Sequence, residues 1–325
     1  MKLYVTAQEI AERIYGVVEG DKEDKVYGLA LPFDANQKEL TFIGSSFPIK
    51  KLSQVNANVI ITPPLLMLPK GKTYIKTACR IEEILDKIIM CFIDRGIYKK
   101  TYHELPIIEE TAKISPNSSV GKNTSIGKMS IIEDYVVIGD NVRIGQNCHI
   151  KSGVNIEAET CIGNNVIIKS GARIGVDSFE YGLRDGEWIR VPNIGRVIIE
   201  DDVDIGANTT IERGTIGDTL IGQGTKIGNQ VEIAHEVKVG MHCKIVAHTA
   251  LAGWSSVGNN TVIYGQCGVS NYVHIGNDVT VLAKSGVTKN IEDGKTISGF
   301  PASDHNGQMR FQAVLRNQIK NKGGM

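Results

Sequence analysis

The sequence predicts a mainly β protein in which a long parallel β-helix lies between a small α/β domain and a C-terminal helix. The main observation is a period of six residues: from Ile114 onward an aliphatic residue returns at every sixth position, often followed by Gly, as in IGDNVR and IGQNCH. An α-helix repeats every ~3.6 residues and a flat strand every ~2, so neither explains this period. The composition agrees with short strands joined by tight turns, because Gly accounts for 35 of 325 residues and aromatic residues for only 6%.

The six-residue units are expected to close into triangular coils. Each unit supplies one short strand and one turn, three units make a coil of eighteen residues, and the aliphatic side chains stack inside. The period holds over residues 114–174, is interrupted by an insertion loop at 175–196, resumes over 199–211, slips by four residues at 217–220 and continues over 221–287. The motif resembles the hexapeptide repeat of left-handed parallel β-helices, so we expect a left-handed coil.

The segment before the β-helix lacks the six-residue period. We expect the β-helix to cover residues 107–297 and a separate α/β domain, a candidate nucleotide-binding domain, to cover residues 1–106. In that domain, residues 6–16 have the pattern of a helix with Thr6 as N-cap, and residues 79–96 have helical spacing of apolar side chains and a final Gly. The stretches ELTFIG and ANVIIT have the composition of short strands.

Residues 298–325 form a polar C-terminal extension that is expected to contain a helix. An apolar stripe runs along it from Met309 to Ile319. A single helix of this length is marginal in water, so we expect the stripe to pack against another surface. Its basic residues Arg310, Arg316 and Lys320 could meet an acidic carrier protein, although for each residue singly a solvated helix face is the favoured explanation.

Charge and composition exclude several classes of protein. Lys plus Arg and Asp plus Glu are both 36, so a basic surface for nucleic acid is not expected. No stretch has the ~20 apolar residues of a membrane helix, and the N-terminus lacks the apolar segment of a signal peptide. None of the six cysteines forms a CxxC pair. These observations predict a cytoplasmic protein with reduced thiols and no integral membrane segment.

Three sequence segments point to a more specific family than the hexapeptide repeat alone. The segment GRVIIEDDVDIGANTTIERGTIGDTLIGQGTKIGNQVEIAHEVKVG (195–240), the loop GVDSFEYGLRDGEWIRVPNIGRV before it and the tail SGFPASDH resemble the UDP-3-O-(3-hydroxyacyl)glucosamine N-acyltransferases of lipid A biosynthesis. The resemblance implies a homotrimer with active sites between neighbouring β-helices. It also implies transfer of an acyl chain from acyl carrier protein to the amino group of a UDP-linked glucosamine, with no cofactor beyond the acyl thioester.

His235, within the string IAHE, stands where the family has the histidine that is taken as general base. A neutral imidazole within hydrogen-bond reach can remove the proton of an attacking amine. Gly253 lies eighteen residues on, so we expect it beside His235 on the next coil, with its N–H as a candidate donor to the oxyanion. Glu232 or Glu236 could orient the imidazole. The six-residue period by itself favours an exposed surface histidine; the matching string favours the catalytic role.

Three candidate substrate-binding residues stand at or directly beside positions that depart from the family pattern. Tyr272 stands where a second histidine is usual, and Asn229 follows Gly228 where the family has Asp before Asn. Trp254 stands where a small residue is usual and could shorten the channel for the acyl chain; a trimer-interface anchor is the alternative.

In the N-terminal domain, Phe42 and Phe47 are the candidates for contact with a nucleotide base. They lie in FIGSSF, where the family's uridine site has an FLSNPKY-like string, and the Asn and Lys of that string are missing. Packing in the core of the domain is the alternative for both.

Other functions remain open on the sequence. One is a divergent sugar N-acyltransferase that uses a short-chain acyl-CoA and another nucleotide-linked amino sugar, and another is a trimeric scaffold whose site has decayed. A zinc site of His242, His248 and His274 is disfavoured, because their offsets from His235 of 7, 13 and 39 residues are out of phase with an eighteen-residue coil. We therefore expect no metal.

Overall fold

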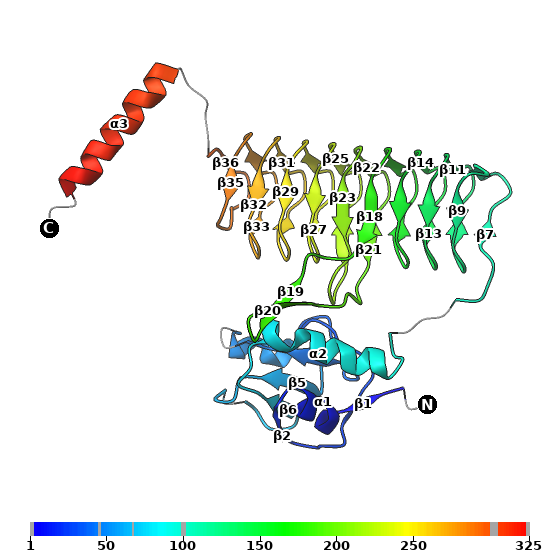
Figure 1. The fold of residues 1–325 in the computed structure, drawn as a ribbon, viewed down its shortest axis with the longest axis vertical. Helices are drawn as coiled ribbons and strands as arrows, with labels where there is room; N and C mark the ends of the chain where they lie inside the picture. The colour runs from blue at the N-terminus through cyan, green and yellow to red at the C-terminus, as the bar shows by residue number, and fades with distance from the viewer. Residues whose placement is uncertain (1–2, 45–46, 67, 99–101, 300–304, 323–325) are drawn as a thin grey trace.

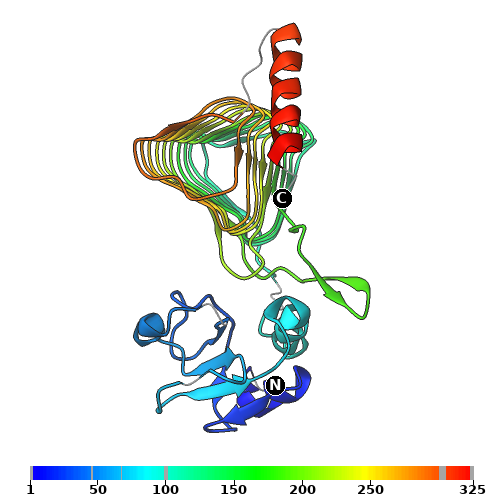
Figure 2. The same cartoon turned by 90° about the vertical axis from the view of Figure 1, so that its left-hand side faces the viewer.

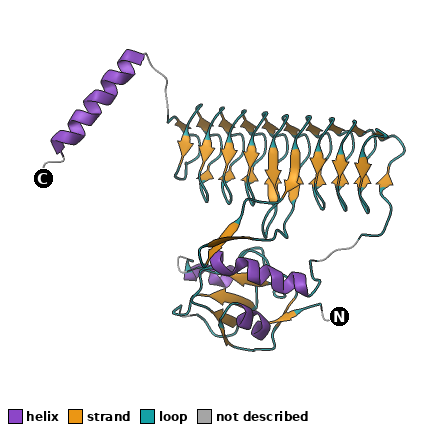
Figure 3. Ribbon diagram, viewed as in Figure 1, coloured by secondary structure: helices purple, strands orange, loops and turns teal. Residues whose placement is uncertain are grey.

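The computed structural model confirms the predicted fold class: a parallel β-helix joined to a small α/β domain and followed by a C-terminal helix (Figures 1 and 3). It describes all residues except 1–2, 45–46, 67, 99–101, 300–304 and 323–325. Figure 2 looks down the coil and shows its triangular cross-section, with the α/β domain lying beside it.

The N-terminal domain contains a four-stranded mixed sheet in the order β2-β6-β5-β4. Its strands are β2 (Val17–Glu19), β4 (Leu40–Phe42), β5 (Val59–Thr62) and β6 (Thr73–Lys76), and β1 (Val5–Thr6) pairs with β3 (Lys25–Val26) outside it. A 3-10 helix, Ile49–Gln54, connects β4 to β5.

Two α-helices complete the domain. Helix α1 (Ala7–Arg13) is shorter than predicted but starts as expected, because the Thr6 hydroxyl accepts the Glu9 N–H and the Glu9 carboxylate accepts the Thr6 N–H. Helix α2 (Ile81–Asp94) turns its apolar face toward the same core, with Ile84, Ile88 and Phe92 fully buried.

Three parallel sheets form the faces of the β-helix. The first consists of β7 (Ile107–Ile108), β10 (Ser125–Ile126), β13 (Arg143–Ile144), β16 (Cys161–Ile162), β21 (Val197–Ile199), β24 (Thr219–Ile221), β27 (Lys238–Val239), β30 (Ser256–Val257) and β33 (His274–Ile275). The second consists of β8 (Lys113–Ile114), β11 (Ile131–Ile132), β14 (His149–Ile150), β17 (Ile167–Ile168), β22 (Asp204–Ile205), β25 (Lys226–Ile227), β28 (Lys244–Ile245), β31 (Val262–Ile263), β34 (Thr280–Val281) and β36 (Thr296–Ile297). The third consists of β9 (Ser119–Val120), β12 (Val137–Ile138), β15 (Asn155–Ile156), β18 (Arg173–Val176), β23 (Thr210–Glu212), β26 (Glu232–Ile233), β29 (Ala250–Leu251), β32 (Gly268–Val269) and β35 (Gly286–Val287).

The aliphatic residue of each repeat stacks inside the coil, as the period predicts. Along the third face, Ile233 pairs with Leu251 and Leu251 with Val269, each eighteen residues apart, and all three are buried. Burial of each such side chain contributes roughly 1.5–3 kcal/mol, so the column is the main source of stability. The turns place one residue per repeat in the left-handed backbone region, including Glu236, Trp254 and Tyr272.

The insertion joins the β-helix to the N-terminal domain. It forms a hairpin of β19 (Tyr181–Arg184) and β20 (Glu187–Arg190) that lies against α2 (Figure 1). The Arg184 guanidinium contacts the Asp86 carboxylate in α2 at 3.0 Å. Val191 after the hairpin and Ile216, directly before the four-residue slip, are both buried in the core of the N-terminal domain. Two interruptions of the repeat therefore hold that domain beside one stretch of the β-helix.

The last helix, α3 (His305–Lys322), lies off the end of the coil in Figure 1. Its side chains Met309, Phe311, Val314 and Leu315 are exposed, so within one chain the predicted packing of the apolar stripe is not observed; Ile319 lies outside the residues whose side chains are described. Among the described helices, none is both long and apolar enough to cross a membrane.

Candidate active site

His235 lies in the turn after β26, where Ile233 points into the coil and the imidazole does not. Its side chain is only 6% exposed, so the exposed-histidine alternative is wrong. The predicted neighbour is confirmed: the Trp254 N–H donates to the His235 carbonyl at 3.1 Å, and a methyl group on Gly253 would lie 2.5 Å from His235 Nε2. Glycine is therefore the only residue that leaves room for the imidazole.

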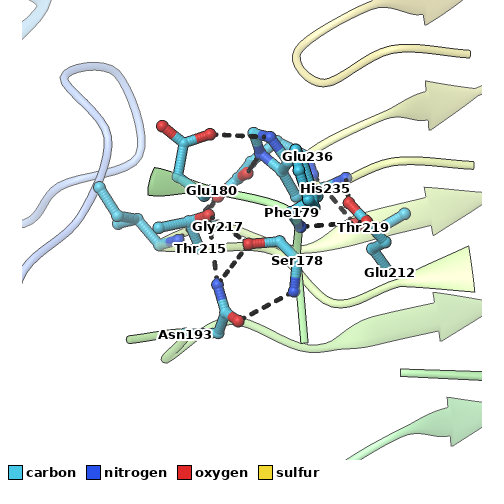
Figure 4. Close-up of polar contacts among 11 residues, drawn as sticks. Ser178, Phe179, Glu180, Asn193, Glu212, Thr215, Gly217, Thr219, His235 and Glu236 are labelled. Carbon is cyan, nitrogen blue, oxygen red and sulfur yellow. Dashed lines mark hydrogen bonds and ion pairs between the residues drawn. The ribbon is translucent and has the colours of Figure 1, made fainter. Parts of the chain in front are cut away.

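Glu236 orients the imidazole. Its Oε2 lies 2.6 Å from His235 Nδ1, and its Oε1 accepts the backbone N–H groups of Ile216 at 2.7 Å and Gly217 at 3.0 Å (Figure 4). The carboxylate is buried and both of its oxygens are held, so it can fix the ring and the proton on Nδ1. The sequence did not decide whether Glu232 or Glu236 orients the imidazole; in the structure Glu236 contacts it.

A second carboxylate contacts the other ring nitrogen. Glu180, at the start of the insertion hairpin, places Oε2 at 3.1 Å from His235 Nε2 (Figure 4). The Glu180 side chain is 28% exposed, much more than that of Glu236 at 1%. The imidazole thus lies between two carboxylates, one enclosed by the repeat and one at the edge of the site.

Glu212 links the insertion to the turn that carries His235. Its Oε1 accepts the Phe179 N–H at 3.1 Å and its Oε2 accepts the His235 N–H at 3.1 Å. The preceding residue of the insertion is also fixed, because the Ser178 N–H donates to Asn193 Oδ1, and Asn193 Nδ2 donates back to the Ser178 hydroxyl (Figure 4). The backbone of the two residues before Glu180 is therefore held by hydrogen bonds, which fixes the point from which the Glu180 side chain reaches His235.

The carboxylates set the protonation of the site. Burial would lower the pKa of His235, but the hydrogen bonds and negative charges of Glu180 and Glu236 outweigh it and raise the pKa to about 9. Burial, together with the nearby Glu212, raises the pKa of Glu232 to about 7. Burial also raises the pKa of Glu212. While Glu180 contacts Nε2, His235 is a cation at neutral pH; as a base it must first lose that contact.

Trp254 and Tyr272 form a stacked aromatic pair, and Trp254 contacts His235. The Trp254 ring meets the imidazole edge-on, with ring centroids 6.2 Å apart and an interplanar angle of 86°, and it stacks on Tyr272 at 6.2 Å and 13°. Tyr272 is 71% exposed. The structure therefore brings three of the predicted positions, Gly253, Trp254 and Tyr272, to the same corner of the coil as His235.

The other predicted positions lie elsewhere. Asn229 is exposed on another corner, where its Oδ1 accepts the Ala207 N–H at 2.8 Å. Phe42 lines a cavity of about 640 Å³ between β4, β5 and the start of α2, together with Pro63 and Arg80. Phe47 stacks on Phe33, with ring centroids 5.7 Å apart. Their assignment as substrate-binding residues stays a prediction.

No metal-binding cluster is present among the residues that the structure describes: no three His, Cys, Asp or Glu side chains lie close enough together to hold an ion. His242 and His248 are each exposed at separate turns, and His274 Nδ1 lies 2.9 Å from the Ser256 hydroxyl. The expectation of no metal stays a prediction.

Sequence reasoning missed Glu180 and Glu212. Glu212 could have been found, because Ile211 pairs with Ile233 at an offset of 22 residues once the four-residue slip is added to eighteen, which places Glu212 one coil before the turn of His235. Glu180 gave no such signal, because the insertion has no repeat from which its neighbours can be counted.

Comparison with known proteins supports the assignment of the repeats. The family described as bacterial transferase hexapeptide (six repeats) matches residues 123–158, 141–175 and 218–253. A UDP-3-O-acylglucosamine N-acyltransferase of Methylobacterium nodulans is 55% identical over 108 residues, which are 33% of this chain and 31% of that protein. A protein of the same name from Wolinella succinogenes is 39% identical over 163 residues, 50% of this chain and 51% of that protein.

Among solved structures, a UDP-N-acetylglucosamine acyltransferase of Francisella novicida is 26% identical and superimposes with a TM-score of 0.49, covering 65% of this chain and 73% of that one. The matches to the first two curated relatives span 31% and 46% of their length. The chain thus carries the bacterial transferase hexapeptide repeat and is a homologue, over those stretches, of proteins named UDP-3-O-acylglucosamine N-acyltransferase.

Proposed function

We propose that the chain is an N-acyltransferase that moves an acyl group from an acyl thioester to the amino group of a nucleotide-linked amino sugar, as in lipid A biosynthesis. The observation that carries the proposal is the pairing of His235 with Glu236 beside the bare backbone of Gly253. The similarity to proteins named for this reaction supports it. We further propose acyl carrier protein as donor, a homotrimer as the active form and the cytoplasm as its location.

In this proposal His235 is the general base. The amine attacks the thioester carbonyl as Nε2 takes its proton, and Glu236 on Nδ1 stabilises the imidazolium that forms. The carbonyl oxygen becomes an oxyanion, for which the Gly253 N–H is the candidate donor, since in the described part of the chain that N–H has no other acceptor. When the C–S bond breaks, the thiolate takes the proton from His235.

Thiol release tests the proposal. Acyl carrier protein and coenzyme A thioesters are combined with UDP- and dTDP-linked amino sugars, and turnover with one pair is expected. His235→Asn should reduce kcat by at least 10²-fold. His248→Asn is the matched control: His248 is an exposed turn residue with φ of 61°, a conformation that Asn tolerates, and full activity is expected. Absence of turnover with every pair would favour the decayed scaffold instead.

A second candidate differs in the acyl donor. The contact of Trp254 with His235 favours a short acyl group, because an indole beside the base occupies space that a long chain would need. Trp254→Gly, at a φ of 64° that suits Gly, should raise the rate with long-chain donors relative to short-chain donors. Tyr272→Gly, at a φ of 62°, is the control for loss of an aromatic ring. Rates with long-chain donors that equal or exceed those with short-chain donors, and that Trp254→Gly does not change, would refute a short-chain donor.

A further inference from the structure

The contact between Glu180 and His235 has no place in a simple general-base mechanism. Nε2 must face the attacking nitrogen when the proton moves, but in this structure the Glu180 carboxylate lies 3.1 Å from that atom. One ring nitrogen makes one hydrogen bond, so Glu180 and the acceptor nitrogen compete for the same position.

Of the two carboxylates on the imidazole, only Glu180 is able to change partner. Glu236 is buried, and two backbone N–H groups hold its second oxygen. The Glu180 side chain is partly exposed, and among the described residues His235 is the only hydrogen-bond or ion-pair partner of its carboxylate. The backbone beside it is fixed by the Phe179 N–H on Glu212, so a change of partner requires rotation of one side chain and no movement of the loop.

We propose that Glu180 is the residue that recognises the amino group of the acceptor: the acceptor's ammonium displaces His235 Nε2 as the partner of this carboxylate and lies between the two. The inference rests on the proposed function for the identity of the acceptor as an amino sugar. An ammonium has three N–H donors, so it can pair with Glu180 and still direct one N–H to Nε2; a hydroxyl has only one.

The exchange also accounts for the protons. With Glu180 turned to the ammonium, His235 keeps one carboxylate, releases its proton to solvent and becomes a neutral base. The ammonium then passes one proton to Nε2. Nε2 gives this proton to solvent. As the C–N bond forms, Nε2 takes a second proton from the nitrogen, and when the C–S bond breaks, His235 passes that proton to the thiolate, which leaves as thiol. When Glu180 returns to Nε2, His235 takes up one proton from solvent. The sum is one amide, one thiol and one proton released to solvent.

The first experiment needs no substrate. The titration of His235 is followed by NMR of the full chain with ¹³C-labelled histidine side chains, with His235→Asn identifying its signal. Glu180→Gln should lower the pKa of His235 by about one unit, roughly a tenfold change in its dissociation constant. The other groups that face His235, namely Glu212, Glu236, Trp254 and Tyr272, stay in place. Glu187→Gln, at an exposed position of the same hairpin, should leave the pKa unchanged.

The second experiment measures recognition. UDP-glucosamine and UDP-glucose differ at one position, where the first has an ammonium and the second a hydroxyl. Calorimetry at neutral pH should show at least tenfold preference for UDP-glucosamine, and Glu180→Gln should abolish that preference by weakening the amino sugar alone, while Glu187→Gln should not.

An unchanged pKa of His235 in Glu180→Gln, or equal weakening of both sugars, would overturn the role of Glu180. If the unaltered chain binds neither sugar, the acceptor named under the proposed function is wrong. The NMR titration then decides whether Glu180 controls His235.

Discussion

At the scale of single residues, the site depends on two buried carboxylates, of which one holds the His235 imidazole and the other the His235 backbone. One oxygen of Glu236 contacts the His235 imidazole, and the other accepts the Ile216 N–H. One oxygen of Glu212 accepts the His235 N–H, and the other accepts the Phe179 N–H in the insertion. Their carboxylates are buried and hydrogen-bonded on both sides, which fixes the ring more firmly than a surface contact could. His235 is therefore positioned by segments that interrupt the repeat.

Gly253 gives the prediction at this scale. Gly253→Ala places a methyl group 2.5 Å from His235 Nε2, and the ring, held at Nδ1 by Glu236, has to move. We expect kcat to fall by at least 10²-fold, with an unchanged circular dichroism spectrum, in the thiol-release assay.

Gly268→Ala is the matched control for that substitution. Gly268 lies one strand further along the same face, and a methyl group there meets nothing within 4 Å. Equal activity of the two variants would mean that the approach of Gly253 to His235 has no role in the reaction.

At the scale of elements, the hairpin of β19 and β20 connects the two domains and carries Glu180 at its start. The repeat period predicted each short strand of the coil, because the position of an aliphatic residue in one unit fixes its partner eighteen residues away. The period could not predict the hairpin, whose position depends on a tertiary contact between Arg184 and Asp86, side chains 98 residues apart. For the same reason Gly253 was predicted as a neighbour of His235 and Glu180 was not.

The Arg184–Asp86 ion pair should matter for the position of Glu180. Arg184→Ala removes a partly buried pair worth about 1 kcal/mol and should loosen the hairpin on α2. We expect faster hydrogen exchange in residues 181–190 and a several-fold rise in the acceptor KM, and restoration by the charge exchange Asp86→Arg with Arg184→Asp.

Arg190→Ala serves as the comparison, because Arg190 pairs with Asp177 at 3.8 Å on the exposed side of the same hairpin. Faster exchange in that variant to the same extent would show that any lost charge loosens the hairpin, and that the contact with α2 has no particular effect.

At the scale of the whole molecule, the buried acids and His235 make stability depend on pH. The folded-state pKa of His235, about 9, is above its usual 6.5, so its stabilising contribution of about 3 kcal/mol is complete below pH 6.5 and is lost as pH rises to 9. The pKa of Glu232 is raised from 4.5 to about 7, so its stabilising contribution is likewise lost as the pH rises, between pH 4.5 and pH 7.

We therefore expect the Tm to fall by several degrees between pH 6.5 and pH 9, measured by circular dichroism during heating. His235→Asn should remove that slope, and Glu232→Gln should reduce the fall between pH 4.5 and pH 7, to which the raised pKa of Glu212 also contributes. A Tm that is constant or rises between pH 6.5 and pH 9 in the unaltered chain would contradict the assignment of His235 as a buried cation.

The regular spacing of the coils also makes the chain modular. Ser125 pairs with Arg143 in the next coil of the same face, and the segment between them repeats the geometry of its neighbours. Removal of residues 125–142 would join two positions in the same register and shorten the molecule by one coil, with His235, Gly253, Trp254, Tyr272 and the insertion left intact. The length of this protein is thus an adjustable quantity, separable from the chemistry that we assign to one corner of it.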